Sequence, residues 1–387
     1  MQPYTKRTWT EINLDCLEHN YHQIKALLPQ TDIIATVKAD GYGHCAEPVA
    51  RHLQELGVHF FSVSNIDEAT ALRDDQIQGD ILILGYTPVE QAEELVKYNI
   101  IQTVFSPEFA QELNLAAQKA GITVRVHVAL DTGMSRIGFQ ATQSCWEIGE
   151  IERLYHYPHL KIEGYFTHLC HADSTEEGPR NFTLHQKQLF DQMIRQLQQK
   201  GYHTGVSHIQ NSAGIQMLQG NHYDLARPGI VLYGLHPSGQ VTIPGLKPVL
   251  QLKSVISMVK EIEANVTVGY SRTFTTKKAT KIATVCIGYA DGWPRLLSNR
   301  GYVLVNGQKV PIIGNVCMDQ LMLDVTGIPA KQGDIVTLIG KDGNLEITAD
   351  QVAESIGTIG YELVCQISKR VPRAIYQNGK LIEVIEY

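Results

Sequence analysis

The feature that most constrains this chain is a long alternation of apolar runs with amphipathic helical patterns between residues 33 and 233. The run Ile81–Leu84 is apolar throughout, which is typical of a parallel strand buried on both faces. Thr87, Pro88 and Glu90 follow it in the order that predicts a helix start. Eight runs of this kind are predicted strands: Ile33–Val37, Phe60–Val63, Ile81–Leu84, Ile101–Phe105, Val124–Leu130, Ile162–Phe166, Val206–Gln210 and Tyr223–Arg227.

Eight strand–helix units in about 200 residues are typical of a closed (β/α)8 barrel. We place this TIM-like barrel at residues 13–241, which makes the fold class α/β. The alternative is an open doubly wound sheet. That fold usually carries a glycine-rich phosphate fingerprint after its first strand, and the sequence has none there. The full length of 387 residues leaves room for a further domain, because one domain takes roughly 150 residues.

The helical patterns end after Pro237, and the remaining sequence predicts a second, mostly β domain over residues 242–387. Val303–Val310 contains Asn306-Gly307 between two apolar runs, which is the strongest short-range signal for a hairpin. Further predicted strands are Lys253–Glu261, Lys281–Ile287 and Asp334–Ile339. The N-terminal segment 1–12 alternates in the same way, and we expect its strand to pair with this domain.

Composition and charge exclude several classes of function. Lys and Arg number 33 against 40 Asp and Glu, so the net charge is −7, and no basic run offers a phosphate-binding surface for nucleic acid. No stretch approaches the ~18 apolar residues of a membrane span, and no signal peptide is evident. The seven cysteines are scattered without a CxxC pair, which favours a reducing compartment. We expect a cytoplasmic protein without nucleic-acid or membrane partners.

The reactive groups of a barrel lie at the carboxyl ends of its strands, and Lys38 follows the first predicted strand there. Desolvation at a barrel mouth lowers the pKa of a lysine and makes the nucleophilic amine that Schiff-base chemistry needs. A single loop lysine is more often simply solvated. Lys38 therefore gains weight only from the groups that accompany it.

Arg136 follows the fifth predicted strand and is suited to bind a carboxylate through two hydrogen bonds. The preceding Asp131-Thr132-Gly133 matches the aspartic-protease triplet, but that chemistry needs a second such triplet, which the sequence lacks. His168, Cys170 and His171 after the sixth strand suggest a metal site. Zinc needs four ligands and no second cluster completes the set, so we predict no metal and interpret His168 as a polar site residue.

The ends of the seventh and eighth strands offer phosphate-binding groups. Ser212 supplies a hydroxyl, and Gly229 and Ile230 supply backbone N–H groups, at the place where barrels often bind phosphate. Taken singly, such residues more often belong only to turns. A lysine, a phosphate site, a carboxylate-binding arginine and a second arginine together indicate pyridoxal 5'-phosphate with an amino-acid substrate.

Several segments resemble the alanine racemase family, the bacterial pyridoxal-phosphate enzymes that combine a barrel with a β domain. The most specific is Ala35–His44, which is similar to the family's cofactor-lysine signature. The resemblance extends over nearly the whole chain. Its other segments are Asp131–Arg136, Arg227–Gly229, Val268–Tyr270, Ile287–Gly292, Cys317–Gln320 and Ser368–Arg373.

The resemblance implies a homodimer with shared active sites and a catalytic pair of bases. Lys38 would form the internal aldimine and act on one face of the substrate Cα, while the partner subunit's Tyr270 would act on the other. Arg136 and the backbone of Met318 would bind the substrate carboxylate.

The resemblance also implies how the cofactor is held. Arg227 would face its pyridine nitrogen, and His168 would link Arg227 towards Tyr270. The residues expected to hold the phosphate are Tyr42, Ser212, Gly229, Ile230 and Tyr361.

Two positions depart from the family pattern. Ala129 stands where the family often has a carbamylated lysine, so another group must position Arg136. Asn315 stands where an arginine is common, just before Cys317 and Met318. We expect both departures to affect substrate affinity and selectivity more than reaction type.

The resemblance implies an isomerase, an alanine racemase that interconverts L-alanine and D-alanine and supplies D-alanine for peptidoglycan in the cell wall. A serine or broad-specificity amino-acid racemase is the close alternative. A non-enzymatic pyridoxal-phosphate carrier would resemble the barrel alone, without a second domain or an opposing tyrosine. Amino-acid decarboxylases share both domains but are expected to carry a cysteine-centred substrate loop, whereas Cys317-Met318-Asp319 has the racemase form.

Overall fold

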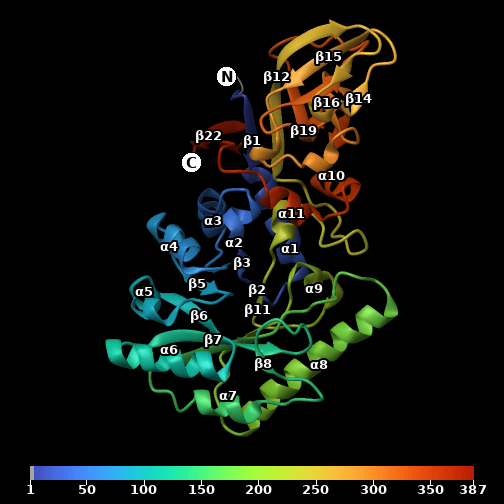
Figure 1. Cartoon of the computed structure of the whole chain (residues 1–387). Helices are drawn as coiled ribbons and strands as arrows, with labels where there is room; N and C mark the ends of the chain where they lie inside the picture. The colour runs from blue at the N-terminus through green and yellow to red at the C-terminus, as the bar shows by residue number, and fades with distance from the viewer. Residues whose placement is uncertain (1–3) are drawn as a thin grey trace.

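The computed structural model describes residues 4–387 and contains a barrel and a β-rich domain. Figure 1 shows the β-rich domain above the barrel, with the long helix α8 on the barrel's outer side. Residues 1–3, which belong to the predicted N-terminal strand segment, lie outside the described residues. No helix among residues 4–387 combines the length and the apolar character needed to cross a membrane.

The barrel strands are parallel neighbours, as their apolar runs predict. Their order is β10-β9-β7-β6-β5-β4-β3, and β11 pairs with β2 to continue the circle. The circle closes where Asn211 and Arg227 form a parallel bridge between the ends of β10 and β11. The strands are β2 Asp32–Ile33, β3 Ala35–Thr36, β4 Phe60–Val63, β5 Asp80–Ile83, β6 Ile100–Val104, β7 Val124–Asp131, β9 Leu160–Phe166, β10 Val206–His208 and β11 Leu225–Ala226, with the short β8 Phe139–Gln140 beside β7.

Helices cover the outside of the barrel and bury one apolar face each. The helix α6 illustrates the local causes: Ser106 caps its first turn, Pro107 begins it, and Gly121 ends it in a left-handed conformation. The helices are α1 Leu14–Leu27, α2 Lys38–Tyr42, α3 Ala46–Glu55, α4 Ile66–Asp74, α5 Ala92–Lys97, α6 Pro107–Ala120, α7 Ile148–Leu154, α8 Glu177–Gln199 and α9 Ser212–Met217, with the 3-10 turns η1 Val89–Gln91 and η2 Ile230–Tyr233.

The β-rich domain is a sheet that curls on itself because β12 pairs with β1, β15 and β19. The predicted hairpin is confirmed: β16 and β17 pair across Asn306 and Gly307, which both have positive φ. The strands are β12 Leu250–Ile262, β13 Thr267–Val268, β14 Phe274–Thr275, β15 Thr280–Val285, β16 Tyr302–Val305, β17 Gln308–Ile313, β18 Leu321–Asp324, β19 Ile335–Asp342, β20 Leu345–Ile347, β21 Arg373–Gln377 and β22 Lys380–Ile385.

Short helical segments connect these strands and reach back to the barrel. They are η3 Tyr270–Arg272, η4 Tyr289–Asp291, η5 Arg295–Leu297, α10 Ala349–Ser355 and α11 Gly360–Cys365. The N-terminal strand β1, Thr8–Asn13, lies between β12 and β21 in this sheet. The α/β class with a barrel and a mostly β C-terminal part is therefore confirmed by the strand pairing.

A buried asparagine joins α1 to the crossing between the two parts of the chain. The Asn20 amide donates to the carbonyls of Leu232 and Lys247 at 3.0 and 2.8 Å, and its oxygen accepts from the Lys247 N–H at 2.7 Å. Because α1 begins directly after β1, these bonds fix the barrel to the β-rich sheet through one helix.

We expect Asn20→Leu to lower the free energy of unfolding by at least about 3 kcal/mol, because three backbone groups lose their partners and each buried unpaired group costs ~1–3 kcal/mol. Urea titration followed by tryptophan fluorescence measures the change. Gln23→Leu, on the exposed side of the same helix, is the control and should change stability little. Equal stability of the two variants would contradict the proposed role of Asn20 in fixing the barrel to the β-rich sheet.

Candidate active site

A cavity of about 440 Å³ opens at the carboxyl ends of the barrel strands, the expected place for a barrel's active site. It is bounded on one side by the barrel loops and on the other by Ile359 and Tyr361 near α11. The structure brings together in its lining most of the predicted cofactor-binding residues: Lys38, Tyr42, His168, Ser212, Arg227, Gly229 and Tyr361. Ile230 is fully buried directly behind Gly229.

Lys38 begins an unusual left-handed turn. Ala39, Asp40, Gly41 and Tyr42 have φ values of 53, 55, 61 and 54°, although only one of them is glycine. A left-handed helical conformation costs an L-residue roughly 1–2 kcal/mol, so surrounding contacts must hold this turn. The turn sets the spacing between the Lys38 amine and the Tyr42 ring at the mouth of the barrel.

Two carboxylates hold the left-handed turn. Glu68 accepts from the Ala39 N–H at 2.8 Å with one oxygen and from the Ser64 N–H at 2.7 Å with the other. Asp40 accepts from the Ala46 N–H at 3.0 Å and from the Tyr387 hydroxyl at 2.5 Å. The turn is thus bound to the next barrel loop, to the start of α3 and to the last described residue.

Ser212 and Gly229 meet close to the Tyr42 hydroxyl. The Gly229 N–H donates to the Ser212 hydroxyl at 2.9 Å, so the loops after β10 and β11 meet here. A Cβ on Gly229 would lie 2.5 Å from the Tyr42 hydroxyl oxygen, which only glycine avoids. Burial raises the pKa of both Tyr42 and Tyr361, so these phenols remain protonated donors.

Arg227 is buried with neutral partners. Its guanidinium donates to the His208 carbonyl at 2.7 Å and to the Thr167 carbonyl at 2.8 Å, and it lies 2.6 Å from His208 Nδ1. Burial lowers the pKa of Arg227, yet a guanidinium stays charged in a protein. Among residues 4–387 no carboxylate pairs with this positive charge, which favours an electron-rich group in the cavity.

His168 lies 3.5 Å from Arg227 and 3.3 Å from the Asn211 amide. Burial, and then the charge of Arg227, lower the pKa of His168 well below its usual value, so the ring is neutral. His208 and His127 continue the chain of rings at 2.9 Å, and burial lowers the pKa of both. We did not predict this pair from the sequence, although two histidines inside apolar strands are a detectable signal.

The predicted carboxylate-binding arginine lies in an adjoining cavity of about 320 Å³ that it shares with Lys38 and His168. Asp131 shapes its turn by accepting from the N–H groups of Gly133 and Ser135 at 2.9 and 3.0 Å. Ala129 is buried in β7 and offers no charge to the Arg136 side chain, which is exposed. The structure thus shows what positions the backbone before Arg136.

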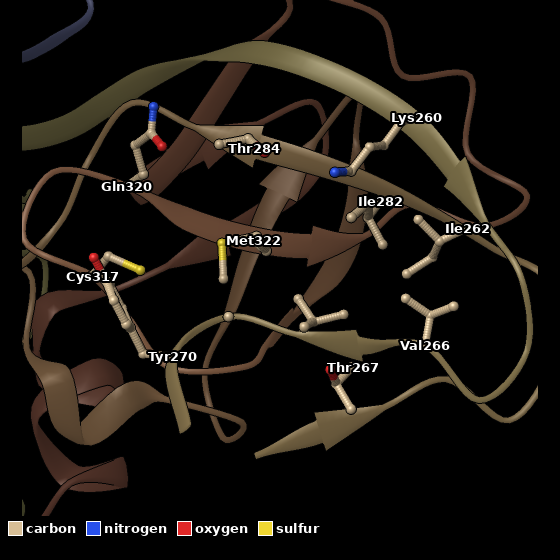
Figure 2. Close-up of a pocket in the computed structure, with 12 residues that line it drawn as sticks. Lys260, Ile262, Val266, Thr267, Tyr270, Ile282, Thr284, Cys317, Gln320 and Met322 are labelled. Atoms are coloured by element: carbon tan, nitrogen blue, oxygen red, sulfur yellow. The ribbon is translucent and has the colours of Figure 1, made fainter. Parts of the chain in front are cut away.

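Tyr270 and Met318 do not line the Lys38 cavity. The Tyr270 side chain is 73% exposed and Met318 is 52% exposed. Figure 2 shows Tyr270 beside Cys317 on one side of a pocket of about 460 Å³ in the β-rich domain, with Lys260 and Ile262 on the other. One chain therefore presents the two predicted bases at separate surfaces.

The predicted absence of a metal concerned His168, Cys170 and His171. Among residues 4–387, the group of possible ligands close enough to share an ion is Asp40, Cys45 and Glu47, which includes none of those three. Cys170 instead contacts Gln186 and the Gly133 carbonyl. Its role is therefore local to the loop after β9.

The residues around the Lys38 cavity fit pyridoxal phosphate. Lys38 offers a primary amine, the hydroxyls of Tyr42, Ser212 and Tyr361 suit a phosphate, and Arg227 lines the same cavity. Lys38 and Arg227, with Arg136 beside them, make the site attractive to an anionic cofactor and an anionic substrate.

Glu68 is a site residue that sequence reasoning missed. Asn65 caps α4 by accepting from the Glu68 N–H at 2.9 Å, and the spacing of these two residues matches a capping box. That signal is visible in the sequence, but it predicts only a helix start. The second contact, from Glu68 to the Lys38 turn, depends on how the loops after β3 and β4 meet.

A barrel whose mouth holds a lysine and phosphate donors, joined to a β-rich domain, defines a class of pyridoxal-phosphate enzymes. Comparison with known families gives the particular one. The family model for the alanine racemase N-terminal domain matches residues 12–237, and that for the alanine racemase C-terminal domain matches residues 249–375. The chain therefore belongs to the alanine racemase family.

Individual relatives agree over the full length. Alanine racemase 1 of Clostridium acetobutylicum is 42% identical and is matched over 99% of both chains. The solved alanine racemase of Clostridium difficile 630 superimposes with a TM-score of 0.92 at 38% identity, again over 99% of each chain.

The family is pyridoxal-phosphate dependent. The Bartonella henselae alanine racemase structure, with covalently bound pyridoxal phosphate, has a TM-score of 0.83 at 29% identity and covers 96% of this chain and 100% of its own.

We expect the Lys38 amine of the cofactor-free protein to be acetylated at a lower pH than an ordinary lysine, whose pKa is 10.5. Burial and the charge of Arg136 lower its pKa, while Glu68 raises it. A lowered pKa leaves more neutral, reactive amine at a given pH. Arg136→Ala should therefore shift the labelling profile to higher pH and Glu68→Gln to lower pH, read by peptide mass spectrometry. Shifts of the same sign would contradict the charge arrangement.

Proposed function

We propose that this protein interconverts L-alanine and D-alanine with pyridoxal 5'-phosphate held at Lys38. The observation that carries the proposal is the convergence of Lys38, the Ser212–Gly229 contact and Arg227 on one cavity at the barrel mouth. Membership of the alanine racemase family supports the substrate. We assign the barrel to residues 13–241 and the domain that supplies the second base to residues 242–387, with the N-terminal strand in residues 1–12.

When bound, the cofactor would make the Cα proton of the substrate more acidic, because it delocalises the electron pair left by the departing proton. Lys38 then holds or accepts a proton on one face of that carbon. Tyr270 does so on the opposite face, so that a proton removed from one side is returned on the other. Tyr270 would need a positive charge nearby to act as a base; Arg227 would supply it, with the neutral ring of His168 linking the two.

Arg227 would face the cofactor's ring nitrogen. As a permanent cation it disfavours protonation of that nitrogen, whereas enzymes that need a stronger electron sink use an acidic partner. Its bonds to the His208 and Thr167 carbonyls fix the guanidinium plane. The proposed result is proton transfer with few side reactions.

The phosphate would be held by Tyr42, Ser212 and Tyr361 together with the backbone of Gly229 and Ile230. The first three offer hydroxyl donors to the cavity, and Gly229 allows close approach because it has no Cβ. Replacing that glycine would push a carbon against the Tyr42 hydroxyl.

The substrate carboxylate would be bound by Arg136 and by the backbone of Met318. Arg136 is exposed within the cavity next to Lys38, which leaves its guanidinium fork available. Tyr361 narrows the space beside the substrate and favours a small side chain such as that of alanine. A serine or broad-specificity racemase is the remaining alternative, and the substrate panel described below decides between them.

We further propose a homodimer in which each active site combines two chains. Lys38 and Tyr270 lie at separate surfaces of one chain, and Tyr270 and Met318 are largely exposed. A two-fold arrangement would place the partner subunit's Tyr270 over the Lys38 cavity. Large exposed apolar side chains of the β-rich domain support such an interface: Met258, Val266, Tyr289, Leu296 and Ile359.

The proposed cellular role is to produce, in the cytoplasm, the D-alanine from which peptidoglycan of the cell wall is made. All seven cysteines are free thiols, which fits a reducing compartment.

We expect the purified holoenzyme to racemise L-alanine faster than L-serine or other amino acids, measured by chiral chromatography. Borohydride treatment should fix the cofactor to Lys38, because its buried amine lies beside the phosphate donors. Peptide mapping identifies the labelled lysine, with Lys119 on the barrel exterior as a residue that should stay unmodified. Label on another lysine, or no racemisation of any substrate, would refute the proposed function.

We expect Lys38→Ala and Tyr270→Ala homodimers each to be nearly inactive, because each lacks one base in both sites. Co-expression of the two variants should restore up to about half of the wild-type activity per mixed dimer, since one of the two sites then has both bases. Differently tagged chains allow purification of the mixed dimer. Mixed dimers without activity would show that both bases come from the same chain.

A further inference from the structure

Tyr270, the proposed second base, lies on a turn whose backbone conformation is unfavourable. Gly269, Ser271 and Arg272 flank Tyr270 with φ values of 74, 59 and 51°. Left-handed conformations at Ser271 and Arg272 are costly for residues with a Cβ. The Tyr270 side chain is 73% exposed, so little packing within the chain holds it. The position of this phenol must therefore be fixed through its backbone.

One buried side chain binds that backbone. The Asn315 amide donates to the Tyr270 carbonyl at 2.9 Å, and Asn315 is only 9% exposed. The two segments approach closely, because a Cβ added to Gly269 would lie 3.4 Å from the Asn315 nitrogen.

The segment that carries Asn315 is itself fixed on both sides. The Gly314 N–H donates to Asn299 at 2.7 Å, and the Val316 N–H donates to Ser298 at 2.9 Å. Further along, the Met318 carbonyl accepts from the Ala290 N–H at 3.0 Å. The segment 314–318 therefore forms a rigid support that joins Asn315 to the backbone proposed to bind the substrate carboxylate.

The same neighbourhood holds the far end of the tyrosine turn. The Asn299 amide donates to the Thr273 hydroxyl at 3.1 Å while its oxygen accepts from Gly314. Arg272 donates to Thr267 at 3.0 Å. These contacts fix the ends of the turn, whereas the Asn315 contact acts on Tyr270 itself.

We propose that Asn315 is a positioning residue for Tyr270, which couples the second base to the Met318 backbone so that both meet the substrate in a fixed relation. This inference rests on the proposed racemase function. Both groups come from one β-rich domain, so they reach the same active site together whichever chain supplies Lys38. Asn315 touches no reacting atom and acts through the Tyr270 carbonyl.

The main test is Asn315→Asp, which keeps the shape of the side chain but replaces the N–H donor with an oxygen facing the Tyr270 carbonyl. We expect kcat to fall about 10- to 100-fold, because a small misplacement of a catalytic group can cost that much. The KM and the absorption spectrum of the bound cofactor should change little, since the Lys38 cavity is untouched.

Deuterium isotope effects separate positioning from general damage. With alanine deuterated at Cα, the isotope effect on kcat/KM should rise for the enantiomer whose proton Tyr270 removes. It should fall for the other enantiomer, because the Lys38 step becomes less rate-limiting. A structural loss without displacement of Tyr270 would lower the activity and leave both isotope effects at their wild-type values.

Asn20→Asp is the matched control, because it makes the same change at a buried asparagine that donates to backbone carbonyls far from Tyr270. It should lower the melting temperature without moving either isotope effect. Asn315→Ala removes the donor without adding a charge and gives the same readout where the aspartate variant yields no folded holoenzyme. Asn315→Gln should have a lower kcat than wild type, because its longer side chain moves the N–H donor away from the Tyr270 carbonyl.

The outcomes distinguish this inference from the function on which it rests. Wild-type protein without racemase activity, or full activity in Tyr270→Phe, would overturn the proposed function and the inference with it. An inactive Tyr270→Phe variant beside unchanged isotope effects in both Asn315→Asp and Asn315→Ala would overturn the positioning role alone.

Discussion

The left-handed turn from Ala39 to Tyr42 is the constraint on which the site depends. A strand that continued directly into an ordinary helix would not place the Lys38 amine and the Tyr42 hydroxyl over one cavity. The turn is unfavourable for residues with a Cβ, and Glu68 and Asp40 offset its cost by binding its N–H groups and its surroundings. The geometry that presents the Lys38 amine is thus maintained by two carboxylates that do not themselves line the Lys38 cavity.

The second property of the Lys38 cavity is its positive charge. Lys38 and Arg227 line this cavity and Arg136 lines the adjoining cavity, while the closest partners of Arg227 are carbonyls and a neutral imidazole. A buried cation without a paired carboxylate is unfavourable in an isolated chain. An anionic phosphate and an amino-acid carboxylate would supply the missing negative charge, so binding energy and selectivity for such molecules have the same origin.

The sequence predicts the barrel strands well because each is a short apolar run that can be recognised without knowing which strands lie beside it in the sheet. The helix after β5 shows the limit of that approach: the spacing of Val89, Ala92 and Val96 predicts a common buried face, yet Leu95 is fully buried and Val96 is 39% exposed. A 3-10 turn at Val89–Gln91 precedes the helix and rotates its face by about one residue. Periodicity alone does not detect such a change of winding.

The sequence predicts that Lys38, Arg136 and Ser212 gather at the barrel mouth, because each lies in a motif that carries chemistry, and the structure places them there. The site could not be predicted where a residue acts only through another. Glu68, His208 and the contact of Asn315 with Tyr270 each join segments far apart in sequence, and nothing local distinguishes them from a cap, a core polar residue or a turn. The two proposed bases differ in how they are held. Lys38 begins a turn that Glu68 and Asp40 hold at the barrel mouth, whereas Tyr270 is held by a backbone contact with Asn315 and, in the proposed homodimer, would meet the Lys38 cavity of the partner subunit.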